Sequence, residues 1–472
     1  MNPPDAQTPV GAANPPRIIH TENMIRVETI KTPGLGDHSY LATDGELAVV
    51  VDPQRDIDRV LAMLDDLGVQ LTYVLETHIH NDYVTGGLEL AGRLGAEYVV
   101  SADDDVSFAR LAVHDGDVLA TGRMRVRAMH TPGHTHHHLS YVLEDETGQP
   151  QAVFTGGSML FGTTGRTDLV GDEHTEQLTR LQFSSVRRLV RELPRQTRVY
   201  PTHGFGSFCS ATPASGESST IGREAEVNPA LTLPEQEYVA TLLAGLDVYP
   251  AYYTRMAPIN RTGPEPVDLS LPEEVSPAEL RRRLENGEWV VDLRDRTAFA
   301  AGHLAGSFGF ELSTNFVTYL GWLYQWGAAL TLVGESVDQV TQARRELVRI
   351  GIDSLAGIAA GDIEALADGE RLRSYPVSDF TGLAKVRTER TVHVIDARRA
   401  DERSRGGVEG SQHIPLHELS DRIDEVPDGE VWVYCASGYR ASIAASVLDR
   451  LGRQVVLIND DYSSARKAGL EG

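Results

Sequence analysis

The chain is poor in cysteine and in long apolar runs. Only Cys209 and Cys435 occur among its 472 residues, which excludes a disulfide framework and is typical of a reducing compartment. No apolar run approaches the roughly 20 residues of a membrane-spanning helix. The first residues lack the basic and apolar regions of a secretory signal, so we expect residues 1–17 to be a disordered tail and the protein to be cytoplasmic.

Positive charge is scarce as well. The 68 Asp and Glu residues outnumber the 43 Lys and Arg residues and give a formal net charge of -25. Nucleic acid and anionic membranes bind to basic surfaces, so neither is expected as a partner. Among the basic residues only Lys31, Lys385 and Lys467 are lysines, a usage typical of high-GC bacterial genomes. The length corresponds to about three domains of about 150 residues each.

Histidine, in contrast, is crowded into one region. Ten of the 16 histidines lie from His78 to His203. In the segment THIHNDYVTGG, His78, His80 and Asp82 follow directly on a predicted apolar strand. A loop at a strand end lets two imidazoles and a carboxylate converge on one ion, and histidine is the commonest metal ligand. This segment is therefore a candidate metal-binding loop.

Three further elements follow predicted strands in the same way. They are HTPGHTHHH with His134, VFTGGSM at 153–159, and YPTHG with His203. Four such elements in order predict a metal site, which a single H-x-H pair would not. Because consecutive residues cannot all face one ion, we expect at most one or two of the histidines at 136–138 to join the site and the others to be solvated. Cys209 lies in a loop of small residues, where we expect an exposed, ordinary thiol; a relay role is the alternative.

The sharpest motif lies near the end of the chain. An apolar strand is predicted up to Cys435, and an amphipathic helix begins near Ala441. Loop amides and a helix N-terminus place the sulfur in positive potential, which stabilises an anion on it. This predicts a catalytic cysteine that holds a persulfide and passes its outer sulfur on, whereas an inert, half-buried cysteine is the alternative. The predicted anion-binding loop consists of Ala436, Ser437, Gly438 and Tyr439, with Arg440 as a further catalytic residue.

The last 200 or so residues contain an internal repeat, too long in period for a solenoid and right for two tandem domains. WVVDLRD matches HVIDARR, GHL at 302–304 matches QHI at 412–414, and ALTLVG matches WVYC. The last match places Gly334 at the position of Cys435. Each copy is predicted to be a small α/β domain with a parallel sheet, over 275–372 and 375–472. An acidic, turn-rich linker is predicted over 257–274, after a first domain at 18–256.

The order THxHxD, TPGHT, FTGG, GRTD, YPTH and NPAL resembles the metallo-β-lactamase superfamily, in its persulfide dioxygenase and glyoxalase II branch. The C-x-x-G-x-R loop resembles the sulfur-transferring members of the rhodanese family. The first copy of the repeat has the rhodanese outline without the cysteine, and so resembles a pseudo-rhodanese. The resemblance implies an α/β fold class, with a metallo-β-lactamase αββα sandwich followed by two rhodanese-like α/β domains with parallel sheets.

The same resemblance implies a metal site at His78, His80 and His134. In the persulfide dioxygenase branch a single iron is held by the positions of His78, His134 and an aspartate. Here that aspartate position is Gly157, and Tyr83 stands where the members with two metals carry histidine. We therefore expect a mononuclear site for Fe²⁺ or Zn²⁺, or no metal if the site is degenerate.

One arginine is also assigned by the resemblance. Arg166 in GRTD matches a position near the thiol-substrate pocket, so substrate binding is expected there. An ion pair with Asp168 that only supports the loop is the alternative.

The domain order resembles the fused persulfide dioxygenase–sulfurtransferases of bacterial sulfide detoxification. We expect the protein to oxidise low-molecular-weight thiol persulfides to sulfite and to transfer sulfane sulfur through Cys435, with thiosulfate or sulfite as other small partners. Three alternatives stay open. They are a rhodanese with a metal-free, degenerate metallo-β-lactamase domain, a glyoxalase II-like thioester hydrolase, and a non-catalytic sulfur-carrier scaffold. The sequence does not decide between a monomer and a homo-oligomer.

Overall fold

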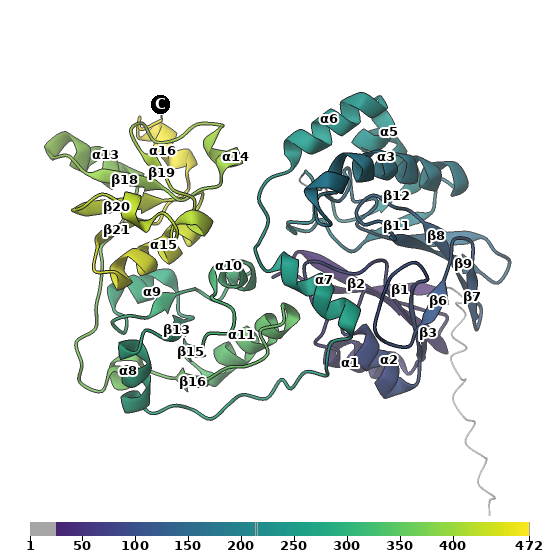
Figure 1. Cartoon of the computed structure of the whole chain (residues 1–472), viewed down its shortest axis with the longest axis horizontal. Coiled ribbons are helices and arrows are strands. Elements are labelled where there is room, and N and C mark those ends of the chain that lie inside the picture. The colour runs from purple at the N-terminus through teal and green to yellow at the C-terminus, as the bar shows by residue number, and fades with distance from the viewer. Residues whose placement is uncertain (1–24, 213, 215, 472) are drawn as a thin grey trace, which may run out of the picture.

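The computed structural model describes residues 25–212, 214 and 216–471. The predicted tail over 1–17 lies outside these residues. The described chain folds into four sheets that follow one another in sequence (Figure 1). Two six-stranded sheets come first, then a four-stranded sheet and a five-stranded sheet.

The first two sheets pack face to face. Apolar residues that alternate along the strands, such as Val49 and Val126, are completely buried between them. The first sheet has the order β1-β2-β3-β4-β5-β6, and the second has the order β12-β11-β10-β9-β8-β7. Their bounds are β1 (Arg26–Thr32), β2 (Asp37–Thr43), β3 (Leu47–Val51), β4 (Gln70–Leu75), β5 (Glu97–Ser101), β6 (Leu111–Val113), β7 (Val118–Thr121), β8 (Met124–His130), β9 (Leu139–Asp145), β10 (Pro150–Gly156), β11 (Arg198–Pro201) and β12 (Ser219–Thr220).

Helices cover both outer faces of this pair of sheets (Figure 1). In α3 the residues Phe183, Val186 and Leu189 recur at helical spacing and are buried against the second sheet. The resulting layers are helix, sheet, sheet, helix, which is the predicted αββα sandwich. The helices are α1 (Asp58–Leu67) and α2 (Gly87–Leu94) on the first sheet, and η1 (Asp172–His174), α3 (Thr175–Glu192), α4 (Ile221–Val227), α5 (Pro229–Thr232) and α6 (Glu235–Gly245) on the second.

The predicted linker differs from the structure at its start. Helix α7 (Tyr253–Thr262) includes residues 257–262, although Pro258 lies inside it. Met256 and Ala257 are buried, so packing outweighs the helix-breaking tendency of proline. The irregular part of the connection therefore begins at Gly263.

Two parallel sheets make up the rest of the chain, as predicted. The four-stranded sheet has the order β14-β13-β15-β16, and the five-stranded sheet has the order β17-β21-β20-β18-β19. The first contains α8 (Pro277–Glu285), β13 (Trp289–Asp292), α9 (Arg296–Ala301), β14 (Phe308–Gly309), α10 (Phe316–Leu323), β15 (Leu330–Gly334), α11 (Val337–Arg349), β16 (Gly357–Ala360) and α12 (Ile363–Ala367). The second contains β17 (Val377–Ser378), α13 (Phe380–Glu389), β18 (His393–Asp396), α14 (Ala400–Arg403), β19 (Gln412–His413), η2 (Leu416–Glu418), η3 (Ile423–Glu425), β20 (Glu430–Tyr434), α15 (Tyr439–Arg450), β21 (Gln454–Ile458) and α16 (Ser463–Lys467).

Strand pairing tests the internal repeat residue by residue. Asp292 pairs with Val333 in the first sheet, and Asp396 pairs with Tyr434 in the second. The next residues, Gly334 and Cys435, are therefore equivalent, as predicted.

The match between GHL and QHI is wrong. β19 at 412–413 pairs with β18 as β14 at 308–309 pairs with β13, so QHI corresponds to residues 308–310. The shared histidine suggested a false alignment, because GHL lies at the end of α9 and not in a strand.

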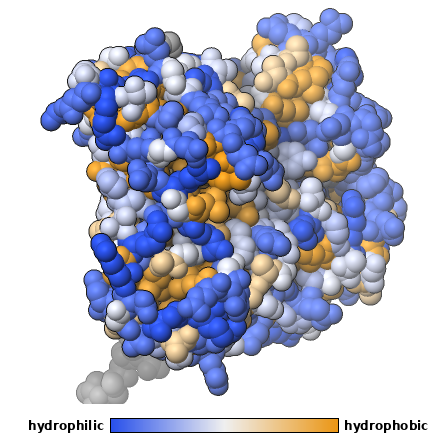
Figure 2. Space-filling view, turned by 60° about the vertical axis from the view of Figure 1, so that its left-hand side comes forward, coloured by the Kyte–Doolittle hydropathy of each residue, from blue (hydrophilic) through white to orange (hydrophobic). Residues whose placement is uncertain are grey.

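One apolar cluster links all three parts of the chain. It includes Tyr83 from the first part, Phe316 and Leu320 of α10, and Cys435 and Tyr439 from the last part. The outer surface is mainly hydrophilic with separate hydrophobic patches (Figure 2). Among the described residues, no helix has the length and apolar character needed to cross a membrane.

Candidate functional site

Four histidines from different strand ends meet in the first part of the chain. His78 and His80 follow β4, His134 follows β8, and His203 follows β11. Each is at most 1% exposed. Five pairs of these rings are in contact, and the two ring centroids of each pair lie 4.0 to 5.6 Å apart. The structure thus brings the predicted ligands His78, His80 and His134 together and adds His203.

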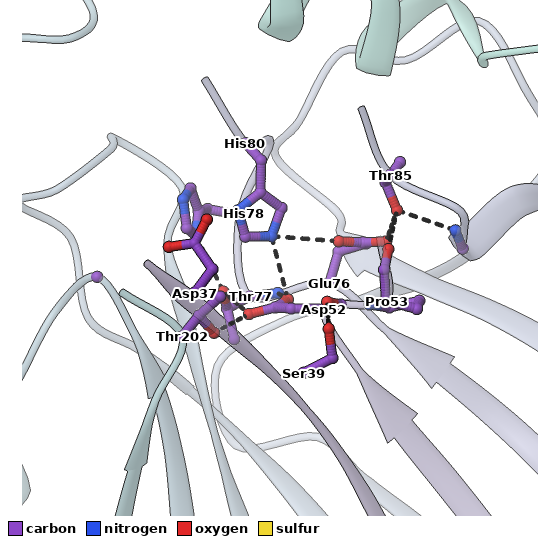
Figure 3. Close-up of polar contacts among 12 residues, drawn as sticks. Asp37, Ser39, Asp52, Pro53, Glu76, Thr77, His78, His80, Thr85 and Thr202 are labelled. Carbon is purple, nitrogen blue, oxygen red and sulfur yellow. Dashed lines mark hydrogen bonds and ion pairs between the residues drawn. The ribbon is translucent and has the colours of Figure 1, made fainter. Parts of the chain in front are cut away.

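His80 is held by two buried carboxylates. Its Nε2 lies 3.3 Å from Asp52 Oδ1 and 3.3 Å from Glu76 Oε2. Figure 3 shows both contacts as dashed lines. Burial alone would lower the pKa of His80, but the two carboxylates outweigh it and raise the pKa to about 9. Tyr83 Oη lies 2.9 Å from the same Nε2. The other ring nitrogen, Nδ1, is buried and has no hydrogen-bond partner.

His203 is oriented in a similar way. Its Nδ1 donates to Asp37 Oδ1 at 2.9 Å and lies 3.1 Å from Asp82 Oδ2. Burial disfavours a charge on this ring, yet Asp82 and Asp37 raise the pKa of His203 well above its usual value. Its Nε2 faces His78 Nε2 at 3.4 Å.

His134 lies over Gly157, the glycine found where the resembled enzymes have an aspartate. Its Nδ1 donates to the carbonyl of Arg166 at 2.7 Å, while Nε2 is buried without a partner. A Cβ placed on Gly157 would lie 2.2 Å from Cδ2 of the His134 ring. Burial, and then the charge of His203, lower the pKa of His134 to about 3. The neutral ring therefore fills space next to Gly157 and keeps a free lone pair.

The three consecutive histidines separate as predicted, with one of them in the interior. His136 and His137 are half-buried, whereas His138 is completely buried. His138 Nε2 accepts a hydrogen bond from the amide of Gly157 at 3.1 Å, and its ring stacks on His78. Its position directly before the buried strand β9 is the only sequence signal for this burial.

The prediction of an exposed thiol at Cys209 is wrong. Cys209 is 1% exposed, and its Sγ lies 3.8 Å from Tyr253 Oη. Burial raises the pKa of the Cys209 thiol. Its sulfur and one ring nitrogen each of His134 and His203 lie within 4.8 Å of one another. The small residues of its loop allow close packing under α7, so their size led to the wrong expectation of exposure.

The donor atoms of this cluster fit a metal ion. His80 Nδ1, His134 Nε2 and Asp82 Oδ1 are buried without a hydrogen-bond partner, while Asp82 Oδ2 is paired with His203. Unpaired buried polar atoms are costly, and a cation among them removes that cost. Imidazole and carboxylate donors suit ions such as zinc and ferrous iron. The cluster therefore forms a histidine- and aspartate-containing metal site.

Arg166, the predicted substrate-binding residue, is engaged by the protein itself. Its guanidinium binds Asp168 through two hydrogen bonds of 2.6 and 2.7 Å and also donates to the carbonyls of Phe208 and Asp247. It lines a cavity of about 710 Å³ together with Arg399. These contacts fit the alternative interpretation of a structural ion pair.

The cysteine loop of the last part has the predicted course. Cys435 follows β20 and is 1% exposed. Within the described part of the chain, none of the main-chain N–H groups of Ala436, Ser437, Gly438, Tyr439 and Arg440 donates a hydrogen bond. Gly438 has a φ of 90°, which favours glycine, and a Cβ there would collide with Asn459. The five residues that follow Cys435 thus have free main-chain amides at the start of α15.

Arg440 has a partner that the sequence did not reveal. Glu402 of α14 accepts two hydrogen bonds from its guanidinium, at 2.5 and 2.7 Å. Burial opposes the charge on Glu402, but Arg440 outweighs this effect and holds the pKa of Glu402 below its usual value. The positive charge beside the loop is therefore partly neutralised.

The equivalent loop of the middle part is closed by a side chain. A Cβ on Gly334 would lie 2.9 Å from Gln339 Oε1. Gln339 also accepts from the amide of Glu335 at 2.8 Å and donates to the carbonyl of Leu293. This loop lacks the thiol, and side chains accept from its amides at Glu335 and Gln339.

Comparison with known proteins identifies one family for the first part of the chain and another for the last part. The family model described as the metallo-beta-lactamase superfamily matches residues 33–203, and that of the rhodanese-like domain matches residues 381–468. The chain is 29% identical over 238 residues to the mitochondrial persulfide dioxygenase ETHE1 of Homo sapiens, which covers 50% of this chain and 81% of that protein. It is 33% identical over 177 residues to the probable polyketide biosynthesis zinc-dependent hydrolase BaeB of Bacillus velezensis, covering 36% and 74%.

A solved structure extends the likeness beyond the first two sheets. The crystal structure of a metallo-beta-lactamase from Staphylococcus aureus aligns with a TM-score of 0.64 at 27% identity and covers 72% of this chain and 100% of that chain. The part of this chain that aligns with that structure is longer than the segment 33–203 matched by the family model. The chain therefore belongs to the metallo-β-lactamase superfamily, with ETHE1 persulfide dioxygenases among its homologues, and carries a rhodanese-like domain at residues 381–468.

Proposed function

We propose that this protein is an enzyme of sulfur metabolism that carries sulfane sulfur on Cys435. The observation that supports this most directly is the loop of five free amides after Cys435. A buried sulfur anion needs such donors, and each charge-assisted hydrogen bond contributes about 1.5–3 kcal/mol. The rhodanese-like match over 381–468 covers this loop.

The transfer is a pair of nucleophilic displacements. The Cys435 thiolate, having lost its proton to solvent, attacks the outer sulfur of thiosulfate or of a thiol persulfide. The new S–S bond forms on Cys435 as the donor's S–S bond breaks, and sulfite or the parent thiol leaves with the electron pair. A nucleophilic acceptor then removes the outer sulfur and regenerates the Cys435 thiolate. The loop amides hold the negative charge on sulfur at both stages.

Replacement of Cys435 tests this proposal. Cys435→Ser is expected to abolish sulfur transfer from thiosulfate to cyanide while leaving the fold intact, because the change is small. Mass spectrometry of the wild type after incubation with the donor should find one added sulfur on the peptide that contains Cys435. Cys209→Ser serves as the matched control and should keep the transferase activity. Full activity of Cys435→Ser, or added sulfur on Cys209 alone, would contradict the proposal.

For the amino-terminal centre we propose low-molecular-weight thiol persulfides as substrates. The similarity to proteins named persulfide dioxygenases supports this class. We propose a single ion held by His78, His134 and neighbouring donors, because Tyr83 occupies the position of a second-site histidine and is hydrogen-bonded to His80. The same observation disfavours a thioester hydrolase with two metals.

The residues of this centre have definable roles around the ion. When bound, Fe²⁺ would supply the redox and Lewis-acid chemistry that oxidation of a persulfide by dioxygen requires. Asp37 and Asp82 hold the Nδ1 proton of His203, and the carbonyl of Arg166 holds the Nδ1 proton of His134. Because the side chains of the cluster are buried, they are shielded from bulk solvent.

Dioxygen uptake tests the proposed oxidation. Iron-loaded protein should consume dioxygen when glutathione persulfide is added and should release sulfite. The zinc-loaded protein is the control and should not. Loaded, folded protein without uptake would show that this centre does not oxidise persulfides and would leave the transferase function unaffected.

A further inference from the structure

The metal centre lacks an acidic side chain at Gly157, and a buried thiol lies beside it. We infer that Cys209 is a ligand of the metal ion together with His134 and His203, and that its thiolate replaces the carboxylate that Gly157 cannot provide. His78 completes a four-coordinate site. This assignment concerns metal ligation and holds whichever reaction the centre performs.

The spacing of the donor atoms carries the inference. Cys209 Sγ and one nitrogen each of His134 and His203 lie within 4.8 Å of one another, and all three residues are buried. Ligands on one tetrahedral zinc ion, at about 2.1 Å for nitrogen and about 2.3 Å for sulfur, are about 3.5 Å apart. Movements of about 1 Å would therefore bring all three into contact with one ion.

The fourth donor is already at the required distance. His78 Nε2 and His203 Nε2 are 3.4 Å apart. Two nitrogens bound at about 2.1 Å to one tetrahedral ion are separated by about 3.4 Å. In the folded protein these two rings therefore face each other as two ligands of a single ion would.

His134 and His203 each use one ring nitrogen for a hydrogen bond, which leaves the other nitrogen for a metal ion. His134 donates through Nδ1 to the carbonyl of Arg166, and its Nε2 is buried without a partner. His203 uses Nδ1 toward Asp37 and Asp82, so Nε2, which faces His78, is the nitrogen left for the ion. Metal-binding histidines characteristically donate their second N–H to a carbonyl or a carboxylate in this way. Asp82 therefore orients His203 and does not take the place of Cys209.

Main-chain contacts fix the thiol next to His134. The carbonyl of Cys209 accepts from the amide of Arg166 at 2.8 Å, and Gly165 forms a β-bridge with Ser210. The carbonyl of Arg166 in turn accepts from His134. Residues 165 and 166 thus connect the loop of Cys209 to the imidazole with which it would share the ion.

The chemistry of this donor set selects a class of metal. Binding of M²⁺ forms a metal–sulfur bond and releases the thiol proton of Cys209 to solvent, with no change of oxidation state. Thiolate and imidazole favour zinc and its analogue cobalt, whereas magnesium and calcium prefer oxygen donors. We therefore expect tight binding of one Zn²⁺ or Co²⁺ per chain and weak binding of Mg²⁺.

Cobalt spectroscopy of the full-length protein tests the assignment. Wild type loaded with one Co²⁺ should show an intense thiolate-to-cobalt charge-transfer band in the near ultraviolet. Cys209→Ser should lose this band, whereas Cys435→Ser should keep it. A band that persists in Cys209→Ser would overturn the inference, as would a wild-type protein that binds cobalt without a band or binds neither Co²⁺ nor Zn²⁺.

X-ray absorption of the zinc-loaded protein gives a second readout that does not depend on enzyme activity. The wild type and Cys435→Ser should each show one sulfur neighbour at about 2.3 Å from zinc. If Cys209→Ser does not fold, this measurement on Cys435→Ser still decides, because Cys209 is then the only thiol in the chain. A zinc ion with only nitrogen and oxygen neighbours in Cys435→Ser would refute the inference, whatever the persulfide activity.

Discussion

At the scale of single residues, Asp104 gives the clearest pH-dependent effect outside the two sites. It is 7% exposed, and its Oδ2 has no hydrogen-bond partner. Burial, only partly offset by the charges of Arg261 and Arg110, raises the pKa of Asp104 to about 7. The folded protein keeps this proton up to about pH 7, whereas the unfolded chain loses it near pH 4. The protonated Asp104 carboxyl therefore stabilises the fold at low pH, and this contribution is lost as the pH rises from about 4 to about 7.

Asp104→Asn removes this penalty at nearly constant volume. We expect the free energy of unfolding at pH 8 to rise by roughly 2 kcal/mol, with little change at pH 4. Urea denaturation at the two pH values measures the effect. Asp103→Asn is the control, because Asp103 is exposed and should show no comparable gain. Equal changes at pH 4 and pH 8 would contradict the ionisation argument.

Residue identity alone explained part of the metal site. The convergence of His78, His80 and His134 could be predicted because each follows a strand, and here the ends of β4 and β8 from the two facing sheets come together. The ligation proposed for Cys209 could not be predicted, because its burial depends on contacts with α7 and with Arg166, which are distant in sequence. Glu402 was missed for the same reason, since it lies on α14 and reaches Arg440 across the fold.

At the scale of elements, α10 covers the cysteine loop. Its sequence FVTYLGWL is apolar on almost every side, and Phe316 to Gly321 are buried. The Tyr319 ring packs 6.0 Å from that of Tyr439, beside Cys435. Trp322 stacks on His417 and meets Phe208 edge-on, so the helix contacts both neighbouring parts of the chain. A helix that is apolar all round is buried, and here it is buried between domains.

Trp322→Ala is expected to loosen this cover. Removal of the indole leaves His417 and Phe208 without their shared partner, so local opening around Cys435 should cost less free energy. We expect iodoacetamide to alkylate Cys435 in the native protein roughly tenfold faster, which corresponds to about 1.4 kcal/mol. Peptide mass spectrometry distinguishes Cys435 from Cys209.

Trp326→Ala provides the matched comparison. Trp326 lies just after α10 and contacts Tyr324 and Arg255, away from His417. Its replacement should leave the alkylation rate of Cys435 nearly unchanged. Equal acceleration in both variants would mean that general destabilisation, and not the cover over the loop, controls access to the thiol.

At the scale of the whole molecule, ion pairs fix the middle part of the chain to the metal-binding part. Asp56 is completely buried and accepts two hydrogen bonds from Arg349, at 2.7 and 3.1 Å. The carbonyl of Arg349 accepts from the amide of Val84 at 2.7 Å. Val84 directly follows Tyr83, which is hydrogen-bonded to His80. The end of α11 therefore supports the loop that carries His78 and His80.

This connection gives the copy of the repeat that lacks the cysteine a structural role. Its loop at Gly334 has no nucleophile, and Gln339 fills the space. Its helices nevertheless contact both functional sites, α11 near the metal-binding loop and α10 over Cys435. The sequence predicted the loss of the thiol, because that depends on one residue. It could not predict the contacts, because they depend on how three domains pack.

Removal of Asp56 tests whether this packing supports the metal site. Asp56→Ala leaves Arg349 buried without its main partner, which should lower the free energy of unfolding by about 3–5 kcal/mol. We also expect faster loss of bound zinc to a chelator, because the loop after His80 loses its support. Asp58→Ala is the control, since Asp58 is 51% exposed and its ion pair with Arg345 contributes at most about 1 kcal/mol. Zinc loss that is equally fast in the two variants would show that the metal-binding loop holds its shape without the middle domain.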